Sequence, residues 1–199
     1  MAHIDYYFSP LSVFTYFAGT QLEEIAAKHG ATIRYKPFDI MVMMDRLGAP
    51  RPADRPEGRK VYRMQEIRRI AAEKGLTMNP QPDHWPTNAA PSAYAIIAAQ
   101  EAGGGDVGAL IYRIFRATWE ENRDIADDAV ITEALTETGF DPMLSMTGML
   151  KGAEVYTRNT EEALAAGVIG APFYIVTETD ERFWGQDRLD ALDTYLGTL

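Results

Sequence analysis

The sequence contains no cysteine among its 199 residues. It therefore forms no disulfide bond, and it supplies neither a thiol nucleophile nor a thiolate ligand for a metal. The absence of cysteine is compatible with a reducing compartment. Disulfide exchange by the chain itself is excluded.

Metal ligands and long apolar runs are also scarce. His3, His29 and His84 are the only histidines, and no two of them have the spacing of ligands on one helix. No stretch of about 18 apolar residues is present to cross a membrane. The first residues lack the basic and then apolar layout of a signal peptide. We therefore expect a cytoplasmic protein with no metal and no membrane contact.

Positive charge is scarce overall but concentrated in one segment. The net charge is −10, which argues against general binding of nucleic acid. Between Asp45 and Arg69, however, eight basic residues outnumber four acidic ones. The basic residues are Arg46, Arg51, Arg55, Arg59, Lys60, Arg63, Arg68 and Arg69. This segment is either a solvated helix face with paired charges or a collar that attracts a small polyanionic ligand.

The predicted strands lie near the two ends of the chain, and a block of predicted helices separates them. Apolar residues make up 46% of the chain, an ordinary share for one globular domain. Alternation predicts strands at 3–8, 31–35, 173–177 and 182–184. Helical spacing and end signals predict helices at 11–28, 40–47, 59–74, 88–103, 106–121, 127–138, 141–151, 158–166 and 187–198.

The order β-α-β, helical block, β-β-α is that of an α/β thioredoxin-like fold with a large all-helical insertion. We expect residues 1–39 and 167–199 to form the thioredoxin-like domain, and residues 40–166 to form the helical insertion. Tyr112, Phe115 and Trp119 share one helical face, and we expect them in the core rather than in a pocket wall.

The joint between the first strand and the first helix carries a candidate catalytic serine. Ser12-x-x-Thr15 stands where thioredoxin-like proteins carry Cys-x-x-Cys. Serine is a favoured helix N-cap, which is the simplest explanation of both Ser9 and Ser12. A serine hydroxyl there can also donate a hydrogen bond to a thiolate, whose pKa is lowered at a helix start. Because the chain has no thiol, the sulfur would arrive with a ligand such as glutathione.

Two later segments add the features of a peptide-binding site. Ala171-Pro172 comes immediately before a strand, where proline is tolerated without any function. In a thioredoxin-like layout this bond is expected to be cis and to face the first helix, exposing the N–H and C=O of Ala171 to an extended peptide. Gln186-Asp187 opens the last helix, where Asp is a common N-cap. Free N–H groups there can also hold a carboxylate while Asp187 holds an amino group, which matches the γ-glutamyl end of glutathione.

Several short motifs occur in order along nearly the whole chain. They are Asp5-Tyr6-Tyr7-Phe8 with Ser12-Val13-Phe14-Thr15-Tyr16, Arg59-x-x-Tyr62, Phe115-Arg116-Ala117-x-Trp119 with Arg123-Asp124-Ile125, Gly167-Val168-x-Gly170-Ala171-Pro172, and Phe183-Trp184-Gly185-Gln186-Asp187-Arg188. Each is weak alone. In this order and at these intervals they resemble the 2-hydroxychromene-2-carboxylate isomerases and the related kappa-class glutathione transferases, from the DsbA-like branch of the thioredoxin fold.

The resemblance implies a glutathione-dependent isomerase in bacterial breakdown of naphthalene-type aromatics. It implies that Ser12 stabilises the glutathione thiolate, which adds to the conjugated system of a small aromatic carboxylate, 2-hydroxychromene-2-carboxylate. Bond rotation and loss of glutathione then give trans-o-hydroxybenzylidenepyruvate. The implied glutathione site consists of Arg59 in place of the family lysine, Lys60 beside it, Ala171, Pro172, Gln186 and Asp187. The resemblance also implies a homodimer.

The chain departs from the family pattern at two places. Alignment of the flanking aromatics puts Ser12 at the reactive position, with Val13 in place of a proline. The letters of the family motif, Ser-Pro-Phe/Tyr-Ser, are nevertheless matched by the segment beginning at Ser9. We favour Ser12, because the other register would misplace the whole helix face. A family Gly-Asn that helps to hold glutathione is Gly48-Ala49 here.

Two other functions stay open at this point. A kappa-like glutathione transferase would use the same site and leave glutathione on the product. A non-catalytic binding protein on a thioredoxin-like scaffold is left open by the change at Ala49.

Overall fold

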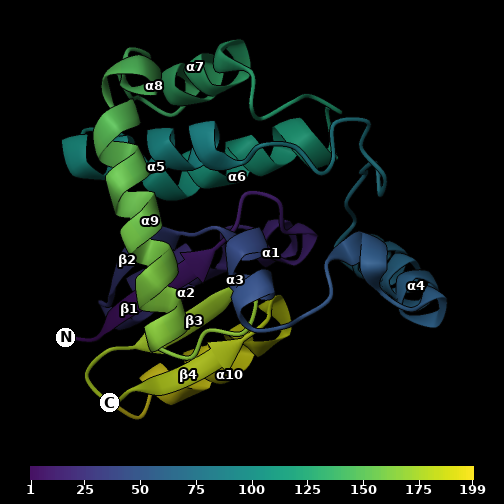
Figure 1. The fold of residues 1–199 in the computed structure, drawn as a ribbon. Coiled ribbons are helices and arrows are strands. Elements are labelled where there is room, and N and C mark those ends of the chain that lie inside the picture. The colour runs from purple at the N-terminus through teal and green to yellow at the C-terminus, as the bar shows by residue number, and fades with distance from the viewer.

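A four-stranded mixed sheet lies at the centre of the computed structural model, which describes residues 1–199 (Figure 1). The strands are β1 (His3–Phe8), β2 (Thr32–Pro37), β3 (Phe173–Val176) and β4 (Glu181–Trp184), in the spatial order β2-β1-β3-β4. β1 runs parallel to β2 and antiparallel to β3, and β4 is antiparallel to β3. The sheet therefore joins the two ends of the sequence, as the predicted thioredoxin-like fold requires.

Both faces of the sheet are covered by helices because the central strand β1 is apolar on both. Tyr6 and Phe8 face a core of 32 buried residues that includes α1 (Val13–Ala18), α2 (Gln21–His29) and α10 (Leu189–Leu196). Tyr7 faces the opposite way, into a smaller cluster with Met43 of α3 (Ile40–Arg46) and Ala163 of α9 (Met149–Ala165). This alternation is the period of two expected for a strand.

The remaining helices all lie between β2 and β3 in the sequence, where the insertion is predicted. They are α4 (Glu57–Glu73), α5 (Ala90–Ala102), α6 (Val107–Trp119), α7 (Asp128–Glu137) and α8 (Leu144–Thr147), with short 3-10 turns at Pro52–Asp54 and, after β4, at Gln186–Arg188. Figure 1 shows α4 standing to one side and α9 running from α8 back to the sheet. The 32-residue core includes residues of α4 to α7, so the sheet and these helices share one core. The division into 1–39 with 167–199 and 40–166 stays a prediction.

Three of the predicted helices differ from the structure. The helix predicted at 11–28 is two helices, because Gly19 adopts φ 58° and ψ −133° and its N–H bonds back to Tyr16. Conversely, the helices predicted at 141–151 and 158–166 are the four-residue α8 and the continuous α9. Gly152 does not interrupt α9; it lets the helix cross α5 closely, since an added Cβ would lie 2.6 Å from the Tyr94 Cβ. No helix is both long enough and apolar enough to cross a membrane.

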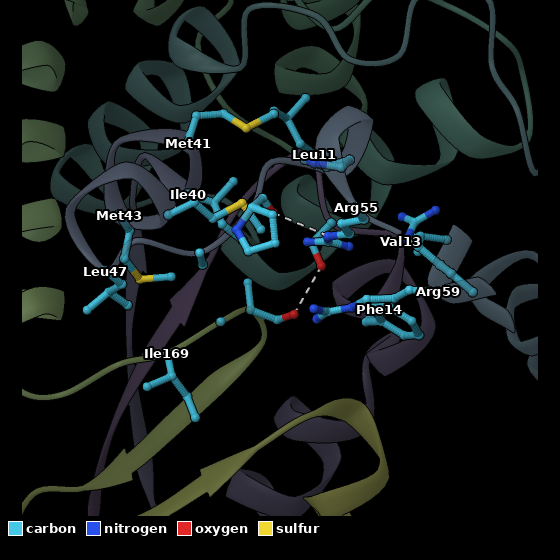
Figure 2. Close-up of a pocket in the computed structure, with 18 of the residues that line it drawn as sticks. Leu11, Val13, Phe14, Ile40, Met41, Met43, Leu47, Arg55, Arg59 and Ile169 are labelled. Carbon is cyan, nitrogen blue, oxygen red and sulfur yellow. Dashed lines mark hydrogen bonds between the residues drawn. The ribbon is translucent and has the colours of Figure 1, made fainter. Parts of the chain in front are cut away.

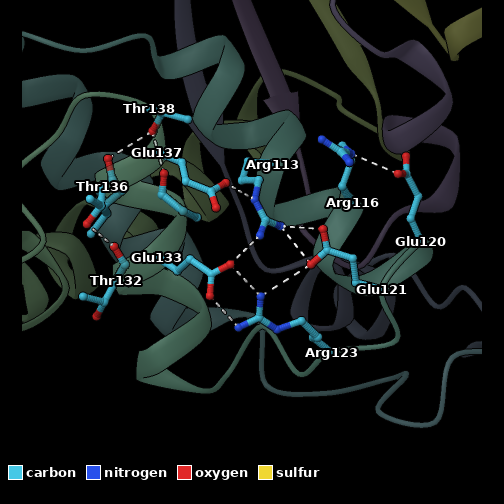
Figure 3. Close-up of polar contacts among 12 residues, drawn as sticks. Arg113, Arg116, Glu120, Glu121, Arg123, Thr132, Glu133, Thr136, Glu137 and Thr138 are labelled. Carbon is cyan, nitrogen blue, oxygen red and sulfur yellow. Dashed lines mark hydrogen bonds and ion pairs between the residues drawn. The ribbon is translucent and has the colours of Figure 1, made fainter.

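An arginine of α6 pairs with three carboxylates, two of them in α7 and one in the connection between the two helices (Figure 3). The Arg113 guanidinium lies 3.1 Å from Glu121, 2.9 Å from Glu133 and 2.5 Å from Glu137. Its side chain is only 10% exposed, and Arg123 also pairs with Glu133. Such a network contributes more than an isolated surface pair.

We expect Arg113→Met to lower the free energy of unfolding by about 1–2 kcal/mol, because it leaves three carboxylates without their common cation. Urea unfolding measures the change. The matched control is Arg46→Met, whose pair with Glu161 is more than half exposed on both sides and is expected to contribute at most about 0.5 kcal/mol. An equal loss in the two variants would contradict a special role for the network.

Candidate active site

The predicted serine lies where the first strand passes into the first helix. Ser12 is the N-cap of α1, and its Oγ accepts a hydrogen bond from the Thr15 N–H at 3.2 Å. The same hydroxyl donates to the carbonyl oxygen of Ala171 at 3.1 Å. The two segments meet because β3 lies next to β1 in the sheet. The Ala171-Pro172 bond is cis, as expected from the sequence.

The loop before β3 offers an unused backbone donor beside Ser12. The Ala171 N–H is half-buried and donates no hydrogen bond within the protein, whereas its carbonyl receives the Ser12 hydroxyl. A carbonyl has two lone pairs, so it can accept a second hydrogen bond. Ala171 therefore keeps the donor and acceptor that an extended peptide backbone would use.

A cavity of about 240 Å³ opens above Ser12 and Ala171 (Figure 2). One wall is apolar and comes from α3; it is formed by Ile40, Met41, Met43, Met44 and Leu47. Phe14, Trp85 and Trp184 add aromatic surface, and Ala49 also lines the cavity. Figure 2 shows Arg55 and Arg59 beside Phe14, across the cavity from Ile40, Met43 and Leu47. The cavity thus combines an apolar wall with a cationic one.

The cationic wall consists of arginines that have no acidic partner. Arg55, Arg59 and Arg63 line the cavity, and none lies within 4.0 Å of a carboxylate. Burial lowers the pKa of Arg63, with repulsion from Arg55 as the smaller cause. Burial also lowers the pKa of Arg55, where the neighbouring Arg59 adds repulsion. An anion bound here would relieve both effects.

The basic segment contains arginines that pair with carboxylates and unpaired arginines that line the cavity, and attraction of a small polyanionic ligand by the second group stays a prediction. Arg46, Arg51 and Arg69 are outside the cavity lining and pair with Glu161, Asp45 and Glu66. Arg55, Arg59 and Arg63 form the collar. These arginines recur every four residues: Arg59 and Arg63 lie on one side of α4, and Arg55 lies just before that helix. That spacing was the signal in the sequence that could have singled out Arg55 and Arg63 alongside Arg59.

The predicted site residues do not all reach the cavity. Ser12, Arg59 and Ala171 line it, whereas Pro172, the residue after Ala171, is buried and is not part of the lining. The Lys60 ammonium lies 4.0 Å from Glu57 and is not part of the lining. Gln186 and Asp187, in the 3-10 turn after β4, are also outside it, although the preceding Trp184 is part of the wall. The roles of these residues toward glutathione stay predictions.

Ser9, the alternative to Ser12, faces a different space. It is 1% exposed and borders a smaller cavity of about 150 Å³ with Asp39 and Tyr156. Its Oγ accepts only a long hydrogen bond, 3.4 Å, from the Leu11 N–H. Ser9 is not part of the lining of the larger cavity. The geometry therefore favours Ser12 as the serine that meets a ligand there.

No metal-ligating cluster competes with this site. The structure contains no group of three or more His, Asp or Glu side chains placed to hold a metal ion. Trp85, which lies between the helices predicted at 59–74 and 88–103, is an unpredicted wall residue of the cavity. Its indole Nε1–H donates to the carbonyl of Leu11 at 2.9 Å, which fixes the ring against the segment that carries Ser12.

Comparison with known sequences identifies a family and several relatives. The family model described as a DSBA-like thioredoxin domain matches residues 3–197. The chain is 28% identical to a 2-hydroxychromene-2-carboxylate isomerase of Sphingobium xenophagum, covering 97% of each chain. It is 29% identical to the protein of the same name from Pseudomonas putida, covering 98% of this chain and 95% of that one. Glutathione S-transferase kappa 1 of Caenorhabditis elegans is 24% identical, over 94% of this chain and 88% of its own.

Solved structures support the same fold. A 2-hydroxychromene-2-carboxylate isomerase superposes with a TM-score of 0.78 at 24% identity, over 98% of this chain and 95% of that one. The cytosolic disulfide reductase DsbM from Pseudomonas aeruginosa, determined with GSH, gives a TM-score of 0.71 at 20% identity, over 98% of each chain. The chain therefore belongs to the family of DsbA-like thioredoxin domains and resembles, over nearly its full length, proteins named 2-hydroxychromene-2-carboxylate isomerase.

Proposed function

We propose that this protein is a glutathione-dependent cis-trans isomerase that converts 2-hydroxychromene-2-carboxylate, or a close aromatic analogue, to trans-o-hydroxybenzylidenepyruvate in aromatic catabolism. The observation that carries the proposal is the Ser12 hydroxyl beneath an arginine-lined cavity in a chain without any cysteine. Support also comes from the full-length relatives, which are named as isomerases and as a glutathione transferase.

The residues around the cavity fit glutathione. This tripeptide is extended and carries two carboxylates, one amino group and one thiol. The unbonded Ala171 N–H and the free lone pair of the Ala171 carbonyl match a peptide backbone. The guanidinium groups of Arg55 and Arg59 match carboxylates, with which arginine forms strong paired hydrogen bonds. When bound, glutathione would supply the thiolate nucleophile that the chain lacks.

The Ser12 hydroxyl can donate a hydrogen bond to a bound sulfur without any movement of its oxygen. The hydroxyl has a single proton, which now goes to the Ala171 carbonyl. Rotation of the O–H bond would redirect that proton into the cavity. The hydrogen bond from the Thr15 N–H to Oγ holds the oxygen in place during this change. Since α1 has only six residues, its dipole adds little, and the hydroxyl is the principal donor.

The apolar wall suits a planar aromatic ring. Three methionines of α3, Met41, Met43 and Met44, have flexible side chains that adapt to the shape of a ligand. Phe14 and Trp85 present aromatic surface to the same cavity. Together these residues would exclude water from the reacting atoms and leave the polar end of the substrate beside the arginines.

A conjugating glutathione transferase is the second candidate. The kappa-class relative favours it, and the same serine, arginines and apolar wall would serve it. The two reactions differ in their products, since a transferase leaves glutathione attached and an isomerase releases it. A non-catalytic binding protein would show glutathione or aromatic binding with no product.

Isothermal titration calorimetry tests the shared requirement of both enzyme functions. Reduced glutathione is expected to bind the purified protein at millimolar concentration or below. Absence of binding in that range would contradict both the isomerase and the transferase.

A further inference from the structure

Arg63 is a partly buried cation that the protein leaves without a counterion. It lines the large cavity, makes no hydrogen bond to the protein and lies within 4.0 Å of no carboxylate. A guanidinium carries five N–H donors, so removing it from water without partners is costly. An acidic ligand in the cavity would supply the missing partner.

Two aromatic rings hold this guanidinium near Ser12. Its carbon lies 5.3 Å from the centre of the Trp85 ring and 5.9 Å from that of Phe14. Trp85 is hydrogen-bonded to Leu11, the residue before Ser12, and Phe14 is the second residue after it. The position of Arg63 is therefore set by the same short segment that positions the serine hydroxyl.

Among the partly buried arginines, only Arg55 and Arg63 of the cavity wall lack a carboxylate partner; Arg34 and Arg68 are also unpaired, but both are exposed. The chain has 29 acidic residues against 19 Lys and Arg, so carboxylates are plentiful. Arg69, six residues further along α4, lies 2.5 Å from Glu66, and Arg51 lies 2.5 Å from Asp45. A carboxylate could be placed beside Arg63 in the same way, yet none is. The arrangement keeps this cation available to a ligand.

The surroundings of Arg63 indicate that its ligand is an aromatic anion rather than a second carboxylate of a peptide. Arg59 is exposed, whereas Arg63 is partly buried against aromatic rings that share the cavity with the methionine wall. An aromatic carboxylate satisfies both features, because its ring contacts the apolar wall and its carboxylate pairs with the planar guanidinium.

We propose that Arg63 binds the carboxylate of the aromatic substrate and thereby selects anionic aromatic substrates, while Arg55 and Arg59 bind glutathione. This inference rests on the proposed function for the identity of the substrate. Arg63 is then a specificity-determining residue: its loss should raise the KM for the aromatic carboxylate and change kcat less.

Binding measurements test this role of Arg63 independently of the proposed reaction. Calorimetry would compare 2-naphthoate with its neutral analogue 2-naphthamide, and in separate titrations reduced glutathione. Wild-type protein is expected to prefer naphthoate. Arg63→Met should weaken naphthoate binding by about 10- to 100-fold, remove the preference over naphthamide and leave glutathione affinity unchanged. Arg63→Lys should restore part of the preference, since the charge returns without the planar fork.

Arg68→Met is the matched control, because Arg68 lies on the same helix, is exposed and is outside the cavity lining. It should bind all three ligands as wild type does. The proposal is overturned if wild-type protein does not prefer naphthoate, if Arg63→Met binds it normally, or if that variant loses glutathione instead. Failure of wild-type protein to bind glutathione contradicts the proposed function, and the naphthoate comparison still decides the role of Arg63.

Discussion

Ser12→Ala is expected to lower kcat for isomerisation by about 100-fold. This is a typical loss when one preorganised hydrogen-bond donor to a reacting anion is removed. The hydroxyl lines the cavity and lies 3.1 Å from the Ala171 carbonyl. Steady-state kinetics with glutathione at saturation measures the change.

The loss of Ser12 also removes a helix cap, so two controls separate chemistry from stability. Losing the cap should lower the free energy of unfolding by about 1 kcal/mol. Ser12→Thr keeps a hydroxyl and a cap, and should recover much of the activity. Ser9→Ala should leave kcat unchanged, because Ser9 borders the smaller cavity and is absent from the larger one. A large loss of activity in Ser9→Ala, with little in Ser12→Ala, would move the reactive site to Ser9.

Trp119→Ala is expected to lower the free energy of unfolding by about 3–5 kcal/mol, the usual range for removing a large buried aromatic side chain. Trp119 is 1% exposed and belongs to the 32-residue core that joins the sheet to the helical block. Its ring centre lies 6.0 Å from that of Trp85, so the cavity left behind would also loosen the wall that holds Arg63.

Trp119→Phe is the matched control for this core position. The Trp119 Nε1–H is buried without a hydrogen-bond partner. Phenylalanine removes that unsatisfied donor while it keeps most of the ring, so its cost should be only about 1 kcal/mol. Urea unfolding monitored by circular dichroism compares the variants. A loss below about 1 kcal/mol in Trp119→Ala would contradict the assignment of this side chain to the core.

The parts of the fold that follow from local patterns were predictable from the sequence. The alternation in residues 3–8 predicts a strand, and β1 spans the same residues. Phe115 and Trp119 are buried as predicted, while Tyr112, on the same face, is partly exposed and stacks on Tyr16. The strand order follows because the two ends of the chain must share one sheet.

The features that could not be predicted depend on long-range packing, which local sequence patterns do not show. Gly152 looks like a helix breaker until α5 is seen to press against it in the middle of α9. Arg55, Arg59 and Arg63 resemble any charged face until the positions of the carboxylates are known. Gln186 and Asp187 were chosen from a turn motif, but only Trp184 of that segment reaches the cavity. Each of these depends on neighbours more than thirty residues away or on which of two sides a residue faces.

The central claim is that the missing cysteine is replaced by the thiol of bound glutathione. The most direct test follows the absorbance of 2-hydroxychromene-2-carboxylate mixed with the protein, with reduced glutathione, with S-methylglutathione and with neither. We predict that the trans isomer forms only with reduced glutathione and that the glutathione is recovered free. Equal conversion with S-methylglutathione or with no addition would contradict the claim.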